Sequence, residues 1–252
     1  MEPTIQLFDV QCGIGAIARG TRRPLDAGDL LSEMRRVAIG GALVRNIPEH
    51  DAADLPFDNM TLYGWCTGHP ELIPCPIVIP NSGCDLTPET DQVAGAITHG
   101  ASAVWIRPGN DSWSLADWVA DPLFNALQER CLPVLCLERL VPIEQIAGLA
   151  RRFPRLPLVL ADTNYRAHRI ILPLLRTFKN VYLSLGNNYG VHRGIEQIAA
   201  ELGVGQLLFG TNFPDSEPMA AITAFMYSEL SDAQKRMIGH GNFERLREGI
   251  VR

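Results

Sequence analysis

The chain alternates short apolar segments with amphipathic ones along its whole length. Apolar runs rich in β-branched residues recur eight times, at 4–10, 41–46, 75–80, 103–108, 133–138, 158–163, 181–185 and 206–212. Near-continuous apolar strands are typical of a parallel sheet covered by helices. Eight strands that alternate with helices predict a TIM-type (β/α)8 barrel, an α/β fold, as a single domain over residues 1–252.

The segments between these runs carry helix signals. Thr87 is expected to cap a helix with Pro88 at its first position, Asp121-Pro122 to open the next, and Pro173 to bend a later one. The expected helices span 29–38, 88–99, 142–150, 166–178 and 192–202, with a further one that begins at 121 and a helical C-terminal tail at 218–230 and 232–238. The stretch 47–73 is expected to be irregular, with at most a short helix around 58–65.

An open doubly wound sheet is the alternative fold. Gly13-Ile-Gly15-Ala-Ile-Ala18 follows the first strand and fits the glycine fingerprint of dinucleotide-binding proteins. The context does not fit, because Gly20 to Pro24 would break the helix that should follow. The next strand also ends in Arg45-Asn46, where such proteins place an acidic residue for the ribose.

Charge and hydropathy exclude several functional classes. Among 252 residues, 22 are basic and 28 acidic, so the net charge of −6 lacks the basic excess of a general nucleic-acid binder. No apolar run approaches the ~18 residues that span a bilayer, and the first residues resemble no secretion signal. We therefore expect a cytoplasmic protein whose partner is a small-molecule substrate or ligand, with no nucleic acid or membrane; a homo-oligomer is compatible with this composition.

The six cysteines form no C-x-x-C pair and no zinc-binding spacing, which favours free thiols. Cys12 follows the first strand and could act as a nucleophile, but no histidine is placed beside it by the sequence. Cys66 and His69 lie three residues apart without a third group to orient them. A packed or structural role is the preferred interpretation of these residues.

In a barrel of this kind, functional groups gather at the carboxyl ends of the strands. These ends carry carboxylates, amides and guanidinium groups but no histidine. The residues are Asp9, Gln11, Arg45, Asn46, Asn81, Ser82, Arg107, Glu138, Arg139, Asp162, Thr163, Asn164, Ser184, Asn187, Asn188, Asn212 and Asp215.

Several segments resemble the amidohydrolase superfamily, in its amidohydrolase-2 branch. The strongest resemblance lies in the last third, at 180–185, 192–199, 202–214 and 241–246, in the order and spacing of that family. Phe8 to Gly15 resembles the opening strand of the family, and 132–137 and 156–161 resemble its fifth and sixth strands. The resemblance covers nearly the whole chain and is weakest at 47–73. It implies a barrel with hydrolase chemistry at the mouth.

The chain departs from this family at the metal ligands. The family opens with D-x-H-x-H, and Gln11 and Gly13 stand at the two histidine positions. Glu138 and Asp162 stand where the fifth and sixth strands usually supply histidines, and Asn212 replaces an aspartate after the eighth. Glutamine, glycine and asparagine are poor ligands for first-row divalent ions. We therefore expect no family-type metal and no other cofactor, as in subgroups of the superfamily that lack these ligands.

Asp162 and Glu138 are the candidate catalytic pair, because burial and mutual repulsion at the mouth would separate their pKa values. Arg107 could hold a substrate carboxylate, and three amides could orient the substrate: Gln11, Asn187 and Asn212. Alternatively, the carboxylates pair with arginines such as Arg139 or Arg166, and the amides fill the space of a lost metal site.

Two functions remain open from the sequence. One is a metal-independent hydrolase or lyase that acts on a small carboxylate-bearing molecule. The other is a catalytically inactive amidohydrolase-like protein that binds a small ligand or a protein partner. Ionisable residues at the strand ends favour the first function, and the loss of every expected metal ligand favours the second.

Overall fold

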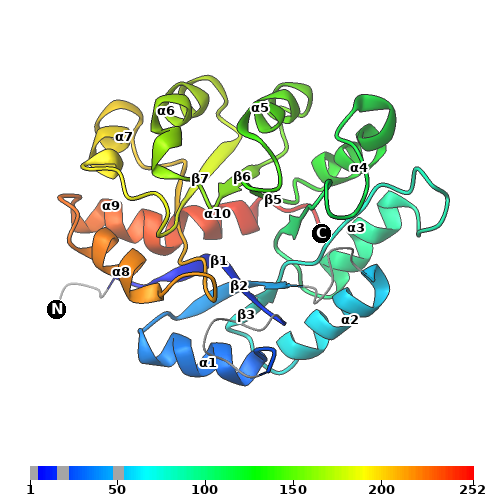
Figure 1. Ribbon diagram of the computed structural model, residues 1–252, viewed down its shortest axis with the longest axis horizontal. Helices are drawn as coiled ribbons and strands as arrows, with labels where there is room; N and C mark the ends of the chain where they lie inside the picture. Colours follow the sequence, from blue (N-terminus) through cyan, green and yellow to red (C-terminus); the bar gives the residue numbers. More distant parts are fainter. Residues whose placement is uncertain (1–4, 16–22, 48–53) are drawn as a thin grey trace.

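The computed structural model describes residues 5–15, 23–47 and 54–252, and it forms the expected barrel of parallel strands (Figure 1). One sheet has the order β1-β2-β3 and the other β4-β5-β6-β7-β8, with every pair parallel. The strands are β1 (Phe8–Ile14), β2 (Gly41–Asn46), β3 (Leu72–Pro74), β4 (Val104–Trp105), β5 (Val134–Leu137), β6 (Leu158–Ala161), β7 (Val181–Leu185) and β8 (Leu207–Phe209).

Backbone contacts close the two sheets into one barrel. A parallel bridge between Ile77 and Trp105 joins the segment after β3 to β4. On the other side, Gly13 N donates to Phe213 O at 2.9 Å and Asn212 N donates to Gln11 O at 2.8 Å, which joins β1 to the segment after β8. The carboxyl ends of all eight strands therefore lie around one mouth.

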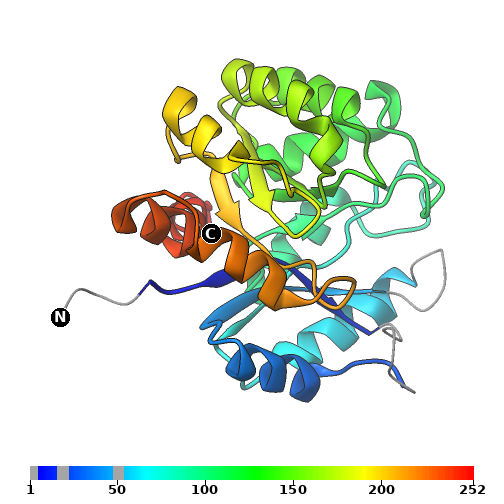
Figure 2. The same ribbon diagram turned by 60° about the vertical axis from the view of Figure 1, so that its left-hand side comes forward.

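Helices cover the outside of the strands. In Figure 2 the helices of the first third and those of the middle of the chain lie on opposite sides of the strands. They are α1 (Ala27–Arg36), α2 (Leu55–Cys66), α3 (Glu89–Thr98), α4 (Asp117–Glu129), α5 (Ile143–Arg152), α6 (His168–Thr177), α7 (Gly194–Leu202) and α8 (Pro218–Met226), followed by the tail α9 (Asp232–Arg236), a π-helical turn (Met237–Gly241) and α10 (Asn242–Glu248). None of the helices in the described part of the chain is long and apolar enough to cross a membrane.

Local sequence signals explain several of these helices. Asp26 and Asp29 form a capping box at the start of α1, which satisfies two backbone N–H groups. In α5, Ile143, Ile146 and Leu149 lie on one buried face. An apolar stripe of this kind is what fixes a short helix against a sheet, because a helix of ten residues is only marginally stable alone.

Two apolar cores lie on the two sides of the strands. The inner core, inside the barrel, contains alternate strand residues such as Val10, Leu43 and Leu135, and α10 covers its amino-terminal end with Phe243 stacked on Phe8 at 4.8 Å. The outer core lies between strands and helices and contains Val44, Cys136 and the buried helix residues.

Some predicted boundaries were wrong. The first strand is 8–14 rather than 4–10, and the third is 72–74 rather than 75–80, because prolines at 74, 76 and 80 remove backbone donors from a regular ladder. The helix expected to open at Asp121-Pro122 begins at Asp117 and contains Pro122. Pro173 lies inside α6, within the helix expected there.

Other corrections concern helix starts and ends. Thr87 does not cap α3, whose N-cap is Pro88 with no side-chain hydrogen bond. The segment expected to be irregular holds the twelve-residue helix α2, with Asp54 as its N-cap. Of the glycine fingerprint, Gly13 and Gly15 lie at the end of β1, and the residues from 16 to 18 lie outside the described residues.

Candidate functional site

A β-bulge in β1 determines which of its side chains reach the mouth. Asp9 pairs with Ala42 and Cys12 with Val44, so β1 has one more residue than β2 between these pairs. Before the bulge Val10 belongs to the inner core, and after it Cys12 belongs to the outer core. The Gln11 side chain lies inside the barrel, where its Oε1 accepts a hydrogen bond from Ser184 Oγ of β7 at 2.8 Å.

Asp9 holds the two ends of the barrel wall together below the mouth. Its carboxylate is buried and accepts hydrogen bonds from Gln11 N at 2.9 Å, Thr211 N at 3.0 Å and the Thr211 hydroxyl. Burial raises the pKa of Asp9 above its usual value, while these bonds and the nearby Arg45 oppose the rise. The acidic residue of the opening motif is therefore a structural clasp between β1 and the segment after β8.

Asp162 and Asn212 meet at the mouth, as expected of the ends of β6 and β8. Asn212 Nδ2 donates to Asp162 Oδ1 at 3.1 Å, and Asn188 Nδ2 donates to the same oxygen at 2.6 Å. Arg139 Nε donates to Asp162 Oδ2 at 3.0 Å. Asp162 and Asn212 both have a positive φ, of 57° and 63°, a conformation that Asp and Asn adopt more readily than most residues.

Glu138 lies next to this group but is held by a different contact. Its Oε2 accepts from the backbone N–H of Asn164 at 2.8 Å, and its side chain is partly buried. The neighbouring Arg139 reaches both Asp162 and, at 3.5 Å, Asp215 after β8. The arginine pairing considered for Asp162 is thus present with Arg139.

Arg107 lies elsewhere on the rim. It forms an ion pair with Asp111, with Nη2 at 2.9 Å from Oδ1, and both side chains are buried. Its guanidinium lies 5.5 Å from the centre of the Trp105 ring. No described contact joins Arg107 to Asp162 or Asn212, so the structure does not bring all three predicted residues together.

Arg45, at the end of β2, is the most deeply buried arginine of the described residues. Its residue is 1% exposed, and its guanidinium lies 5.1 Å from the Trp105 ring. Neither Nε nor Nη1 has a hydrogen-bond partner among the described residues. Burial lowers the pKa of Arg45, but from so high a value that the group stays charged at neutral pH.

The two Arg45 atoms belong to a set of six buried polar atoms near the strand ends that lack a partner among the described residues. They are Gln11 Nε2, Arg45 Nε, Arg45 Nη1, Trp105 Nε1, Thr163 Oγ1 and Asn212 Oδ1. Four of these six are N–H groups that can only donate, one is a hydroxyl and one is an acceptor. Buried polar groups in folded proteins almost always have partners, so this donor-rich set calls for a molecule that accepts hydrogen bonds.

The remaining sequence candidates are placed as follows. Asn187 is exposed, and the next residue, Asn188, makes the contact with Asp162. Arg45, Ser184 and Asn188 were among the polar strand-end residues, but no feature of the sequence ranked them above Arg107 or Asn187. An arginine inside the apolar run Gly41-Ala-Leu-Val-Arg-Asn46 was the available signal for a buried charge.

The cysteine candidates are packed thiols. Cys12 is buried, its Sγ donates to Leu43 O at 3.4 Å, and burial raises its pKa well above the usual value. Burial also raises the pKa of Cys66 to about 12. Thiols with raised pKa values are poor nucleophiles at neutral pH, and neither contacts a base among the described residues.

The residues at the family's metal-ligand positions do not fit a divalent ion. A side chain at Gly13 would meet Ile47, whose Cδ1 and Cγ1 lie 2.9 Å from the added Cβ, so an imidazole there would require Ile47 to move. Arg45, the ladder partner of Gly13, brings a buried positive charge to the same part of the mouth. Asp162 is already bound by three donors, and the described residues hold no cluster of three or more His, Cys, Asp or Glu suited to a metal.

An acidic cavity lies beside the mouth, on the side of β3 and β4. It has a volume of about 670 Å³ and includes Asp54, Asp85, Trp113 and Asp111, the partner of Arg107, in its lining. None of the residues that line this cavity belongs to the donor-rich set around Arg45.

A family model described as amidohydrolase matches residues 85–246, well over half of the chain. The chain belongs to the amidohydrolase family. A search of curated protein sequences finds no significant match to this amidohydrolase. Solved structures confirm its TIM-barrel fold. An uncharacterized TIM-barrel protein from Bordetella bronchiseptica superposes with a TM-score of 0.73 at 17% identity, covering 97% of this chain and 99% of that one.

Two enzymes with the same fold are similar over almost their whole length. 5-Carboxyvanillate decarboxylase from Sphingomonas paucimobilis has a TM-score of 0.73 at 13% identity, with 98% of this chain and 100% of that chain covered. A probable 2-pyrone-4,6-dicarboxylic acid hydrolase from Acinetobacter baumannii, with citric acid bound, has a TM-score of 0.71 at 13% identity, with 96% and 99% covered. At such identities the likeness establishes the fold alone.

Proposed function

We propose that this amidohydrolase binds a small carboxylate-bearing molecule at the barrel mouth and acts on it as a hydrolase or lyase without a family-type metal. The observation that carries the proposal is the set of buried donors around Arg45, which lack partners among the described residues. A carboxylate offers several acceptor sites to such donors, and its charge would offset the buried guanidinium. The decarboxylase and the pyrone-dicarboxylic acid hydrolase of the same fold have names that refer to carboxylic acids.

In the proposed mechanism, Arg45 binds the substrate carboxylate, with the Gln11 amide as a second donor. Arg107, whose charge is paired with Asp111, keeps a supporting role on the rim, where it contacts Trp105. The fixed charge of Arg45 takes the place of a metal in holding an anion. Asn187, which is exposed, would contact only the outer part of a ligand.

Asp162 is the proposed base. Its Oδ1 accepts from Asn188 and Asn212, which orient the carboxylate. Its Oδ2 is bound by Arg139, whose side chain is 50% exposed. Because the Arg139 side chain is half exposed, it can move into solvent, which would leave Oδ2 available to take a proton from the substrate or from an attacking water. Glu138 is the second carboxyl group within the same rim and the proposed acid.

The first experiment measures binding of 2,6-dihydroxybenzoate, 2-pyrone-4,6-dicarboxylate and citrate by calorimetry, with EDTA present. We expect at least one to bind, and Arg45→Met to weaken that binding at least 10-fold, which corresponds to about 1.4 kcal/mol. Arg166→Met is the matched control, because Arg166 is exposed and, among the residues that the structure describes, its hydrogen bonds go to Asn164 and Tyr165. Arg45→Lys, which keeps the charge, and circular dichroism of each variant separate loss of binding from loss of folding.

Equal binding by wild type and Arg45→Met, or binding that requires an added divalent ion, would refute the proposal. Turnover is then followed by absorbance for the ligand that binds. Activity that Asp162→Asn retains in full would remove Asp162 as the base. Binding without turnover would instead support the alternative function, a ligand-binding protein without catalysis, which the three donors bound to Asp162 favour.

A further inference from the structure

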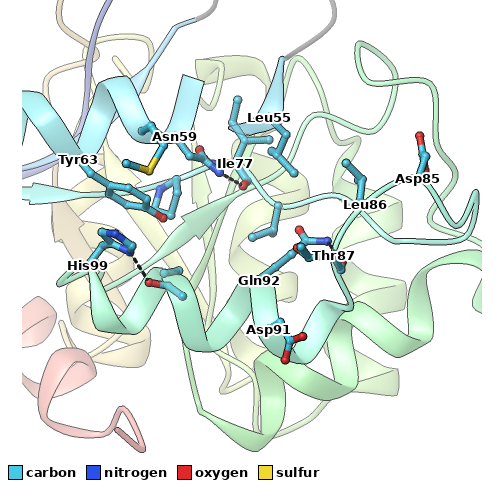
Figure 3. Close-up of a pocket in the computed structure, with 15 residues that line it drawn as sticks. Leu55, Asn59, Tyr63, Ile77, Asp85, Leu86, Thr87, Asp91, Gln92 and His99 are labelled. Carbon is cyan, nitrogen blue, oxygen red and sulfur yellow. Dashed lines mark hydrogen bonds between the residues drawn. The ribbon is translucent and has the colours of Figure 1, made fainter. Parts of the chain in front are cut away.

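A second cavity lies on the side of the barrel, between α2 and α3 (Figure 3). Its volume is about 500 Å³, within the range of small-molecule sites. Its floor is the segment 76–78, which follows β3. The apolar lining comes from both helices and the loop before α3, and includes Leu55, Met60, Ile77, Val78, Leu86 and Ala96.

Most amide groups in this cavity are already bound by the protein. Asn59 Nδ2 donates to Ile77 O and its Oδ1 accepts from Ile77 N, both at 2.9 Å. Gln92 Oε1 accepts from Ile79 N, and its Nε2 donates to the carbonyl oxygens of Ile79 and Thr87. These two side chains therefore shape the cavity and leave little polar capacity for a ligand.

Tyr63 supplies the remaining polar group. Its ring stacks on His99 at 4.2 Å between ring centres and 9° between planes, and His99 Nδ1 donates to Gly95 O at 2.8 Å. Figure 3 shows the Tyr63 hydroxyl directed towards the cavity, and it has no hydrogen-bond partner among the described residues. Burial raises the pKa of Tyr63 to about 12, so the group is a neutral hydroxyl at physiological pH.

Acidic side chains mark the open side of the cavity. Asp85 and Asp91 are exposed and belong to its lining. Asp85 also lines the acidic cavity beside the mouth, so the two cavities meet there. A carboxylate ligand would be repelled on this side, in contrast to the mouth, where Arg45 attracts anions.

We propose that the cavity between α2 and α3 binds a small neutral aromatic molecule with one hydroxyl group, of the phenol class. The ring would lie against the apolar walls, with the Met60 thioether as a favourable contact for an aromatic ring. The hydroxyl would pair with that of Tyr63, which can both donate and accept. The site is independent of the proposed function at the mouth, because it shares no residue with the set around Arg45.

Gly95 provides a sharp test. It lies in α3 and lines the cavity, and a Cβ added there meets no atom within 4 Å. Gly95→Leu therefore adds a side chain at the cavity wall whose Cβ has free space, and leucine favours a helix more than glycine does. Gly148→Leu in α5 is the matched control, because its added Cβ also meets nothing within 4 Å and it does not line the cavity.

Binding is measured by ligand-observed NMR and calorimetry with three probes: phenol, toluene and benzoate. We expect phenol to bind more tightly than toluene, and benzoate not to compete at this site. Gly95→Leu should abolish phenol binding, while Gly148→Leu and Arg45→Met retain it. Tyr63→Phe should remove the preference for phenol over toluene while both still bind.

Three outcomes would overturn the proposal. They are phenol binding that survives Gly95→Leu, benzoate that displaces phenol with equal affinity, and no detectable binding of phenol or toluene at millimolar concentration. Light scattering of the same variants tests whether a second copy of the chain occupies the cavity instead. A dimer that Gly95→Leu abolishes, in a protein that binds no phenol, would assign the cavity to contact between two copies of the chain.

Discussion

Replacing Asp9 with alanine should destabilise the barrel strongly, whereas replacing it with asparagine should not. Alanine leaves the backbone N–H groups of Gln11 and Thr211 buried without an acceptor. Each buried group without a partner costs about 1–3 kcal/mol, so Asp9→Ala should lower the free energy of unfolding by about 2–6 kcal/mol. The Thr211 hydroxyl adds less, because it can rotate.

Asparagine keeps an oxygen for the two N–H groups and removes the cost of burying a charge. We therefore expect Asp9→Asn to stay within about 1–2 kcal/mol of wild type at pH 7. The assay is urea unfolding followed by tryptophan fluorescence and circular dichroism, with the midpoint and slope fitted for each protein. Equal losses for the two variants, or a loss below about 1 kcal/mol for alanine, would refute the clasp between β1 and the segment after β8.

The contribution of Asp9 to the free energy of unfolding should also depend on pH. The folded-state pKa of Asp9 is raised, so the stability that this group contributes is fully present below the unfolded value near 3.8 and is lost as pH rises through the folded value. The free energy of unfolding of wild type relative to Asp9→Asn should therefore fall as pH rises above about 4. A difference that grows with pH would show that hydrogen bonds, not burial, dominate the environment of Asp9.

Three further predictions concern the packing at Gly210, the reactivity of the cysteines and the hydrogen bonds of Asn242. Gly210→Ala places a Cβ against Ser184 Oγ and 2.8 Å from Gln11 Cβ, and it should lower the free energy of unfolding by about 1–3 kcal/mol in urea; an unchanged midpoint would contradict the tight packing of the mouth. Iodoacetamide at pH 8 should label exposed Cys84 first, while buried Cys136, whose pKa is raised to about 12, reacts only after denaturation; equal rates by mass spectrometry would contradict this order. Asn242→Ala removes two bonds that the side-chain amide donates to carbonyl oxygens at 2.7 and 2.8 Å and should lower thermal stability measurably, by about 1–3 kcal/mol; a Tm equal to that of wild type would exclude an anchoring role for this amide.

The sequence was sufficient to predict the barrel because the hydrophobic pattern repeats eight times. The second strand was placed at 41–46, the range that the structure shows. The third strand was misplaced because Ile77 does pair with Trp105, but only as an isolated bridge between prolines. The start of α4 was missed because Pro122 was taken as a helix start, although a proline can lie inside a helix that tertiary packing stabilises.

The site was predictable in outline and not in its pairings. Asp162 and Asn212 were expected at adjacent parts of one rim, and they contact each other. Which arginine forms an ion pair depends on loop conformation, which the local sequence does not specify. Arg107 pairs with Asp111, four residues later, whereas Arg45 Nε and Nη1 have no acceptor among the described residues. The sequence could not separate Asn187 from Asn188 either, because the direction of a side chain in a turn depends on backbone conformation that the residue types do not specify.

The extra residue in β1 separates the two halves of this strand. Residues before it follow the alternation of the inner core, and residues after it are shifted by one position. Without Gln11, Asp9 would still lie opposite Ala42 and Cys12 opposite Val44, with one residue between them as in β2, so the ladder would be regular and Cys12 would stay in the outer core. The extra residue therefore allows β1 to place an amide beside Ser184 while the residues on both sides of it keep their packing, so a change in strand length alone could remove this amide from the mouth.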